Sequence, residues 1–362
     1  MALKTPRGDR GVPTKGRGAP SNLEGRYETW QREAFDDGWA RDEEPLPALK
    51  THVTHEPAKS IIARNNSPDL GFDQSINPYH GCEHGCVYCY ARPSHAYLGL
   101  SPGLDFETRI FAKVNAAELL RKELAAPGYR CSPIAIGVNT DAYQPAEREL
   151  RITRSLIEVL TECEHPFTLI TKNSLIERDI DLVAPAAAKR LTGAAVSITN
   201  LDPELARKLE PRAAAPYRRL ETVKRLADAG IPVTVMVAPV IPFITDRHIE
   251  EILERAKEAG ACGAWYVLLR LPYEVAPLFK EWLATHFPLK ADHVMSLVHQ
   301  MREGKDYDST FGVRQRGTGT FAELIERRFE IACERLGLNG EREPLDTTRF
   351  RPPRRGPQLD LF

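Results

Sequence analysis

The chain has little that points to a membrane, to secretion or to a strongly charged partner. Its longest apolar run, IPVTVMVAPVIPFI at 231–244, is too short for a membrane span and is interrupted by prolines. The first residues, MALKTPRGDR, are basic, but no apolar segment follows them as a signal peptide requires. The net charge is −1 over 362 residues, which gives no global preference for nucleic acid or lipid. We therefore expect a cytoplasmic protein without membrane contact.

Cysteine is scarce as well. The chain has seven cysteines, and four of them stand alone in the sequence: Cys131, Cys163, Cys262 and Cys333. The odd total of seven and the wide spacing of these four argue against a disulfide framework in a reducing compartment. The other three, Cys82, Cys86 and Cys89, lie within the nine-residue segment CEHGCVYCY at 82–90. Such a concentration of thiols indicates a metal or cluster site.

Large apolar residues are nearly absent from the first part of the chain. Residues 1–20 consist largely of Gly, Pro, Lys and Arg, so we expect disorder there, followed by irregular structure over 21–70. Residues 1–70 then form a mostly disordered or irregular N-terminal extension. Residues 348–362, rich in proline and arginine before they turn apolar, are expected to form a flexible tail.

Between these tails, short β-branched runs alternate with amphipathic segments of helical period. The expected strands are 74–80, 132–139, 166–171, 193–199, 231–240 and 264–271, and the expected helices are 115–126, 149–164, 174–189, 216–230 and 246–260. Continuous apolar runs are typical of a parallel sheet covered by helices, so the fold class is α/β. Six units over residues 71–288 fit a partial (β/α)6 barrel, with a flat doubly wound sheet as the alternative. Helices at 291–304 and 321–338 predict a small C-terminal helical cap over residues 289–347.

The spacing C-x3-C-x2-C has two chemical interpretations. A structural zinc site needs a fourth ligand, such as His80, His84 or His95, and usually brings a second cysteine pair from elsewhere. Iron–sulfur clusters are also held by closely spaced thiolates, and electron carriers normally use four. Three thiolates leave one iron of a 4Fe–4S cluster open to an external ligand, as catalysis at a metal requires. We favour the cluster.

The cysteine motif, with an aromatic residue before its last cysteine, resembles that of the radical S-adenosylmethionine (SAM) superfamily. NTDAYQPAE, LITKNS, SITNLDPELARKLEP and VMVAPVIP are similar to the branch related to spore photoproduct lyase, over about residues 74 to 275. The resemblance implies a partial barrel, a 4Fe–4S cluster on Cys82, Cys86 and Cys89, and SAM at the open iron. It further implies reductive cleavage of SAM to a 5′-deoxyadenosyl radical, which abstracts hydrogen from a substrate. An electron donor such as flavodoxin or ferredoxin is then also implied.

The same resemblance implies a set of SAM-binding residues: Tyr88, Asn139, Thr140, Asp141, Lys172, Ser197 and Ala238. Lys172 is expected to pair with the SAM carboxylate, with Ser197 at the same end, while the backbones of Tyr88 and Ala238 meet the adenine. Without the resemblance, residues 139–141 fit an Asx-type turn equally well, and Lys172 fits a solvated lysine. Arg270, which ends the last strand, is expected either to bind an anionic substrate or to pair with a neighbouring aspartate.

The sequence leaves the reaction open. Photoproduct lyases carry a hydrogen-donating cysteine three residues before the aspartate that ends the second strand, and the matching residue here is Val138. Cys131 lies seven residues further back, too remote at ~3.3 Å per residue. Tyr90 is an alternative hydrogen relay, or a packed aromatic side chain. Three functions remain: a radical enzyme on nucleic acid (lyase-like DNA repair or base modification), a radical enzyme on a small molecule or peptide, and an iron–sulfur protein without turnover.

The last five residues, QLDLF, are similar to the motif with which bacterial replication and repair proteins bind the sliding clamp. In that motif the glutamine makes polar contacts and the Leu-Phe pair fills a hydrophobic pocket. These roles fall on Gln358, Leu361 and Phe362, with Leu359 as a secondary anchor. The alternative is that the segment folds back on the helical cap. Clamp binding would favour DNA over a small molecule as the substrate.

Overall fold

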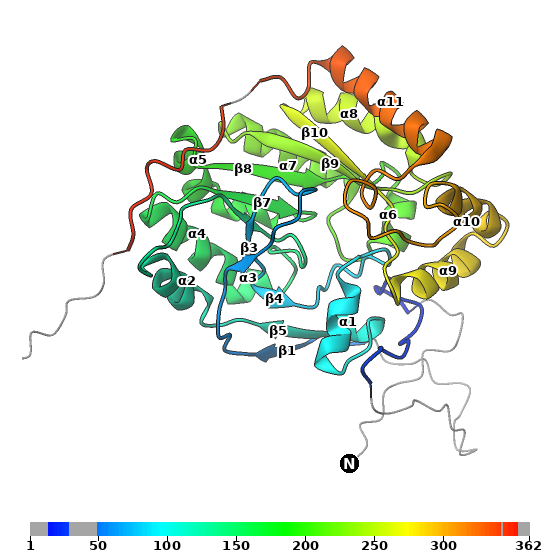
Figure 1. The fold of residues 1–362 in the computed structure, drawn as a ribbon, viewed down its shortest axis with the longest axis horizontal. Coiled ribbons are helices and arrows are strands. Elements are labelled where there is room, and N and C mark those ends of the chain that lie inside the picture. The colour runs from blue at the N-terminus through cyan, green and yellow to red at the C-terminus, as the bar shows by residue number, and fades with distance from the viewer. Residues whose placement is uncertain (1–13, 29–48, 342, 354–362) are drawn as a thin grey trace, which may run out of the picture.

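The computed structural model describes residues 14–28, 49–341 and 343–353 of the chain (Figure 1). Its centre is a seven-stranded sheet with the order β10-β9-β8-β7-β6-β3-β2. The strands are β2 (Ala63–Arg64), β3 (Gln74–Ile76), β6 (Ile134–Ile136), β7 (Phe167–Thr171), β8 (Thr192–Ser197), β9 (Val233–Val240) and β10 (Gly263–Leu268). All neighbours pair in parallel except β2, which is antiparallel to β3. The expected α/β fold is confirmed, and because β10 and β2 form separate edges the barrel is open.

Helices cover one face of this sheet (Figure 1). They are α2 (Ala116–Leu124), α4 (Ile152–Glu162), η2 (Ser174–Asp179), α5 (Ile180–Ala188), α7 (Pro216–Asp228) and α8 (Ile249–Glu258). The short α3 (Glu147–Leu150), α6 (Pro203–Leu209) and η3 (Asp246–His248) follow the carboxyl ends of β6, β8 and β9, and α6 packs in the apolar cluster that contains Cys86 and Tyr88. Along β9, Val233, Val235 and Val237 are buried in the core, whereas Met236 and Ala238 are partly exposed. Because side chains alternate along a strand, the sheet has one helix-covered face and one face that lines the barrel interior.

In the part of the chain that the structure describes, three helices follow β10, and two of them were predicted from the sequence: α10 (Ala291–Gln300) and α11 (Gly319–Leu336). α11 packs on α8, and the ring centroids of Phe329 and Tyr266 of β10 lie 4.8 Å apart. α10 packs against α9 (Val275–His286), a helix that the sequence analysis did not predict. α11 therefore extends the outer layer at the β10 edge, whereas the buried Val294, Met295 and Val298 of α10 join the apolar cluster that contains Cys86 and Tyr88.

The connection between α10 and α11, residues 301–318, joins the two edges of the open sheet, and we call it the bridging loop. At one edge, Leu268 N of β10 donates to Gln315 O at 2.9 Å. At the other, Asp69, in the turn between β2 and β3, accepts from Gly312 N and Arg314 Nε, both at 2.6 Å. The loop thus spans the side on which the barrel strands do not close.

A smaller sheet, of order β1-β5-β4, contains β1 (His52–His55), β4 (Tyr79–His80) and β5 (Arg109–Ala112). η1 (Arg92–Leu98) and α1 (Leu104–Thr108) connect the cysteine segment to β5. The sequence analysis expected irregular structure where β1 and β2 form. Strands of two to four residues are too short to show a period, which is why both were missed.

The N-terminal segment at 14–28 differs from expectation. Gly18 N and Ala19 N donate to the two carboxylate oxygens of Glu107, at 3.0 and 2.8 Å. A Cβ on Gly18 would lie 1.8 Å from the oxygen of Gly85, so only glycine permits this close approach to the cysteine segment. The expectation of disorder over 1–20 is therefore wrong for 14–20. Composition cannot reveal a partner such as the buried Glu107, which lies 89 residues further along the chain.

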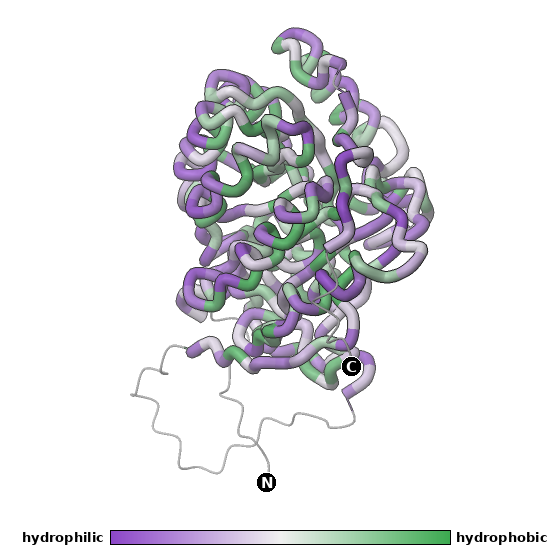
Figure 2. Tube along the Cα trace, turned by 90° about the vertical axis from the view of Figure 1, so that its left-hand side faces the viewer, coloured by the Kyte–Doolittle hydropathy of each residue, from purple (hydrophilic) through white to green (hydrophobic). Residues whose placement is uncertain are grey.

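Hydrophobic residues gather inside the body of the protein and hydrophilic residues follow its outer helices and loops (Figure 2). Within the described residues, no helix combines the length and apolarity needed to cross a membrane. The expected clamp-binding residues, Gln358, Leu359, Leu361 and Phe362, lie outside the described part of the chain.

Candidate functional site

The cysteine segment follows β4 and lies against the end of α6. Val87 N donates to Leu209 O at 3.1 Å, which fixes the middle of the segment. Cys82 and Cys86 are buried, Cys89 is partly buried, and all three are free thiols. Cys89 packs between two apolar clusters, one containing Cys82 and the other Cys86. The structure therefore brings the three predicted ligands into one buried neighbourhood.

The surroundings of these thiols disfavour their charged form. Burial raises the pKa of Cys86 to about 12, and the nearby negative charge of Glu210 adds to the rise. Burial also raises the pKa of Cys82 well above its ordinary value, with a further contribution from Asp141. A bound metal centre supplies the positive charge that stabilises thiolates in such a place. Soft thiolates in an apolar setting suit an iron–sulfur cluster, so the donor set fits.

Two of the three histidines considered for a zinc site, His84 and His95, have other polar partners. His84 Nδ1 lies 3.2 Å from Asp141 Oδ2, and its Nε2 lies 3.1 Å from Asn173 Nδ2. His95 Nε2 lies 3.0 Å from the oxygen of Arg109. In the described ranges, no group of three or more His, Cys, Asp or Glu side chains surrounds a point where one metal ion could bind. Each cysteine of a 4Fe–4S cluster binds its own iron, so the three thiols need not converge on one point.

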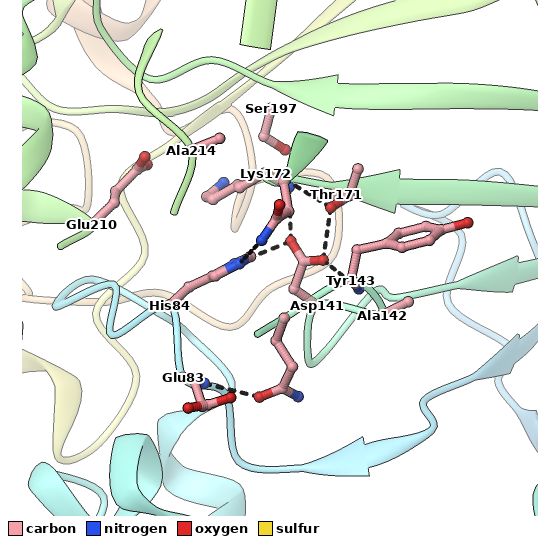
Figure 3. A network of polar contacts seen from close by, with 12 residues as sticks. Glu83, His84, Asp141, Ala142, Tyr143, Thr171, Lys172, Ser197, Glu210 and Ala214 are labelled. Carbon is pink, nitrogen blue, oxygen red and sulfur yellow. Dashed lines mark hydrogen bonds and ion pairs between the residues drawn. The ribbon is translucent and has the colours of Figure 1, made fainter. Parts of the chain in front are cut away.

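Asp141 joins the end of β6 to β7 and to the cysteine segment (Figure 3). Its Oδ1 accepts from Thr171 Oγ1 at 2.7 Å and from Tyr143 N at 2.9 Å. Its Oδ2 accepts from Lys172 N at 2.7 Å and also faces His84. Burial opposes its charge, but His84 and these donors hold the pKa of Asp141 below its ordinary value. Both carboxylate oxygens of Asp141 thus have polar partners within the protein, so Asp141 positions the neighbouring segments of the site.

The two residues before Asp141 lie differently. Thr140 is buried, and its hydroxyl donates to Tyr79 O at 2.8 Å. Asn139 is exposed, and its backbone N–H donates to Asn77 Oδ1 at 2.9 Å. The turn that the sequence predicted is therefore held by the Asn77 side chain of the β3–β4 connection and by the backbone oxygen of Tyr79 in β4.

Three of the other predicted SAM-binding residues come together at the strand ends. Lys172 Nζ donates to Ala238 O at 3.4 Å and lies 5.9 Å from the centre of the Tyr88 ring. Ser197 ends β8, between the strands that carry Lys172 and Ala238, and lies beside Lys172 in Figure 3. The cofactor residues expected from three separate strands thus lie with the cysteine segment at the carboxyl ends of the strands, where parallel strands bring their ends together.

Glu210 belongs to this site, although the sequence analysis did not single it out. Its Oε1 accepts from the hydroxyl of Tyr88 and, at 2.5 Å, from Thr199 Oγ1, while its Oε2 pairs with Arg219. Burial alone raises the pKa of Glu210, but Arg219 and Lys172 lower it to about 2. In the sequence, the segment ELARKLEPR indicates only that a helix ends near Glu210. No motif marks the residue, because its partners come together only in the folded chain.

A second group lies by the cysteine segment at the end of β10. The hydroxyl of Tyr90 donates to the backbone oxygen of Val138. The guanidinium of Arg270 lies 4.7 Å from the centre of the Tyr90 ring, and its Nη2 donates to Tyr307 Oη at 3.2 Å. Arg270 therefore faces two tyrosines instead of the aspartate considered in the sequence analysis. Val138, in the position of the lyase cysteine, is next to Tyr90.

Comparison with known proteins agrees with this geometry. A family model described as the radical SAM superfamily matches residues 76–256, half of the chain. An uncharacterised protein of Mycobacterium tuberculosis is 39% identical over 284 residues, covering 77% of this chain and 79% of its own. An uncharacterised protein of Methanocaldococcus jannaschii is 26% identical, covering 66% and 85%.

The fold is also similar to solved structures. Spore photoproduct lyase in complex with a dinucleoside spore photoproduct matches with a TM-score of 0.56 at 15% identity, covering 79% of this chain and 80% of that one. A variant of the same lyase with bound SAM and the same dinucleoside matches with a TM-score of 0.55 at 14% identity. Family match, fold and cysteine motif agree, so the chain belongs to the radical SAM superfamily, whose enzymes use a 4Fe–4S cluster and SAM.

Proposed function

We propose that this radical SAM enzyme abstracts hydrogen from a nucleic acid. Cys82, Cys86 and Cys89 would hold the 4Fe–4S cluster, which would supply the electron for cleavage of SAM to methionine and a 5′-deoxyadenosyl radical. Lys172 and Ser197 bind the amino acid end of SAM, and Tyr88 and Ala238 border the adenine. Asn139 and Thr140 complete the site.

The observation that carries the substrate class is a group of aromatic rings interleaved with arginines along β10 and the bridging loop. We call it the arginine–aromatic cluster: Tyr90, Trp265, Arg270, Tyr307, Phe311, Arg314 and Arg316. The guanidinium of Arg314 lies 4.8 Å from the Phe311 ring, and that of Arg316 lies 4.4 Å from the Trp265 ring. The Tyr90, Trp265 and Phe311 residues are 39%, 43% and 53% exposed. Exposed rings stack on bases, and Arg270 and Arg316 are the arginines that bind phosphates in this proposal, because Arg314 is paired with Asp69. Stacking rings and arginines together are typical of single-stranded nucleic acid sites.

Arg270 of this cluster also lies close to the proposed radical site. Arg270 stacks on Tyr90, which directly follows Cys89 in the chain. A base lying against Tyr90 is therefore next to the cysteine segment. The fold is shared with a lyase solved with a dinucleoside lesion, which supports the same class of substrate.

Val138 distinguishes this protein from the photoproduct lyases, which carry a hydrogen-donating cysteine at the matching position. The Val138 side chain lacks the weak S–H bond from which a product radical regains hydrogen, and Tyr90, whose hydroxyl donates to Val138 O, takes this role in our proposal. The proposed reaction is therefore lyase-like DNA repair or base modification by a different hydrogen route. A small molecule or peptide as substrate is the second candidate, and Val138 is the observation that favours it.

The test is SAM cleavage by the reconstituted, reduced protein, with and without damaged oligonucleotides. Stimulation by an oligonucleotide, and DNA binding that weakens steeply with salt, support the proposal. Replacing Arg270 with Ala should abolish the stimulation, whereas Arg255→Ala, on the outer helix α8, should not. Equal SAM cleavage with and without every nucleic acid, together with no DNA binding at low salt, would favour the small-molecule candidate.

The proposed partners follow from this function. An electron donor such as flavodoxin or ferredoxin reduces the cluster. The sliding clamp, bound through Gln358, Leu359, Leu361 and Phe362, brings the enzyme to DNA. A cytoplasmic location agrees with both partners.

A further inference from the structure

We infer that Glu210 is a positioning residue, whose carboxylate holds Tyr88 of the cysteine segment and the cofactor-facing Lys172 in one fixed arrangement. The inference rests on the role proposed for Lys172 and on the cluster cysteines. It does not depend on the substrate.

Glu210 lies at the centre of a buried set of polar contacts. Tyr88 reaches it from the cysteine segment, between Cys86 and Cys89, and Thr199 reaches it from the end of β8. Arg219 of α7 pairs with its second oxygen. A single carboxylate therefore ties together three elements that are separate in the sequence.

Each partner has its other polar groups satisfied, as a buried ion pair requires. Arg219 Nη1 donates to Ser197 O at 2.9 Å, and its Nε donates to Ala214 O at 2.7 Å. Thr199 Oγ1 also lies 3.4 Å from Ala238 O, the atom that accepts from Lys172 Nζ. The contacts of Glu210 thus reach β8 and β9 at the two positions proposed to meet SAM.

Charge connects Glu210 to both cofactor sites. Lys172 is close enough to favour the charged form of Glu210, and Glu210 is close enough to disfavour a charged thiol at Cys86. Figure 3 shows Glu210 and Ser197 on either side of Lys172. The negative charge therefore acts on the SAM-facing ammonium and on a cluster ligand together.

Replacing Glu210 with Gln keeps its size and removes its charge. Tyr88 and Lys172 then lose the charge that orients them, and Arg219 loses its partner. We expect SAM affinity to fall about tenfold, the loss typical of one charge-assisted contact. We also expect the midpoint potential of the cluster to become more positive, since a nearby negative charge is gone.

The experiment uses the full chain with reconstituted cluster and no nucleic acid. SAM binding, the change in the electron paramagnetic resonance spectrum on adding SAM, and the cluster potential are measured for E210Q. The matched control is Glu177→Gln, which removes another carboxylate with two arginine partners, Arg218 and Arg225, away from the cysteine segment. A merely structural role predicts loss of stability in both variants with unchanged SAM affinity and potential. That result would overturn the inference.

Two further variants keep the outcome decisive. If E210Q fails to take up iron, Thr199→Val removes one donor to Glu210 without leaving a buried charge unpaired. It should weaken SAM binding in the same direction by a smaller factor, and unchanged affinity and spectrum would refute the inference. Lys172→Ala is measured in parallel. If that variant binds SAM normally, the proposed site is wrong and the inference falls with it, whatever the nucleic acid assays show.

Discussion

Arg314 Nε lies 2.6 Å from Asp69 Oδ2, so an ion pair joins the bridging loop to the β2–β3 turn across 245 residues of sequence. Both side chains are largely buried, at 17% and 8% exposure, and Asp69 also accepts from Gly312 N. This ion pair is one of several contacts that hold the bridging loop over the open side of the barrel. The arginine–aromatic cluster depends on it, because Tyr307, Phe311, Arg314 and Arg316 are all carried by that loop.

Replacing Arg314 with Ala should release the bridging loop. We expect a loss of about 1–3 kcal/mol in the free energy of unfolding, since the buried Asp69 loses a charged donor. Hydrogen exchange over 301–318 should speed up more than in the rest of the chain. Lys305→Ala is the control in the same loop, because its ion pair with Asp308 is exposed on the lysine side. Equal exchange rates in the loop for both variants would contradict the prediction.

The cluster cysteines can be tested singly. Cys82→Ala, Cys86→Ala or Cys89→Ala should each remove most of the iron, because a site with two thiolates no longer holds the cluster. Iron content and the visible absorption of the reconstituted protein measure this. Cys131, Cys163, Cys262 and Cys333 serve as controls, and their Ala variants should retain the cluster. Full iron in any of the first three variants would exclude that residue as a ligand.

The long, periodic elements were the predictable part of the fold. The strand expected at 166–171 is Phe167–Thr171, and the helix expected at 216–230 is Pro216–Asp228. Such segments bury one face, so their sequence carries the period of the structure. α9 also carries a helical period that was not predicted. Its buried residues Val275, Leu278, Phe279, Trp282 and Leu283 have helical spacing, and Pro277 lies in the first turn, where proline is tolerated. That signal was available in the sequence.

The site was predictable only where its chemistry is local. Spacing and family resemblance identified Cys82, Cys86 and Cys89. Glu210 could not be found in this way, because Tyr88 and Arg219 approach it from other segments. No spacing or motif in the sequence indicates that these residues meet. The packing of 14–28 on the cysteine segment was hidden for the same reason. Tertiary contacts of buried charges are the part of this site that composition does not encode.

Lys172 provides the test of the SAM site. Lys172→Ala should keep the cluster but weaken SAM binding by about 1.5–3 kcal/mol, roughly ten- to a hundredfold, through loss of one charge-assisted contact. Isothermal titration with the reconstituted protein measures the affinity. Lys189→Ala, whose exposed side chain pairs with Glu164, is the control and should bind SAM normally. Identical affinities for the two variants would remove Lys172 from the site.

Glu210 also predicts a pH dependence of stability. Its pKa is lowered from 4.5 to about 2, so its charge stabilises the fold fully above pH 4.5 and progressively less as the pH falls towards 2. The shift corresponds to about 3 kcal/mol between these limits. Denaturant unfolding of the cluster-free protein and of E210Q should show a stability difference that shrinks as the pH falls from 5 to 3. A constant difference over that range would mean that Glu210 does not carry this charge in the folded state.

The last prediction concerns the segment QLDLF, which lies outside the described residues and rests on the sequence alone. Its apolar anchors, Leu361 and Phe362, are few and adjacent, as in a binding hot spot, and Gln358 supplies the polar contact. A peptide covering residues 351–362 should therefore bind purified bacterial sliding clamp. The control is the same peptide with Leu361→Ala and Phe362→Ala, which removes the groups that fill the pocket and leaves the basic residues in place. Binding by the first peptide and not by the second would tie this radical SAM enzyme to the DNA replication machinery and so strengthen nucleic acid as its substrate. Absence of binding at high micromolar peptide would refute clamp binding. Equal binding by both peptides would show that the basic residues, and not Leu361 and Phe362, attract the clamp.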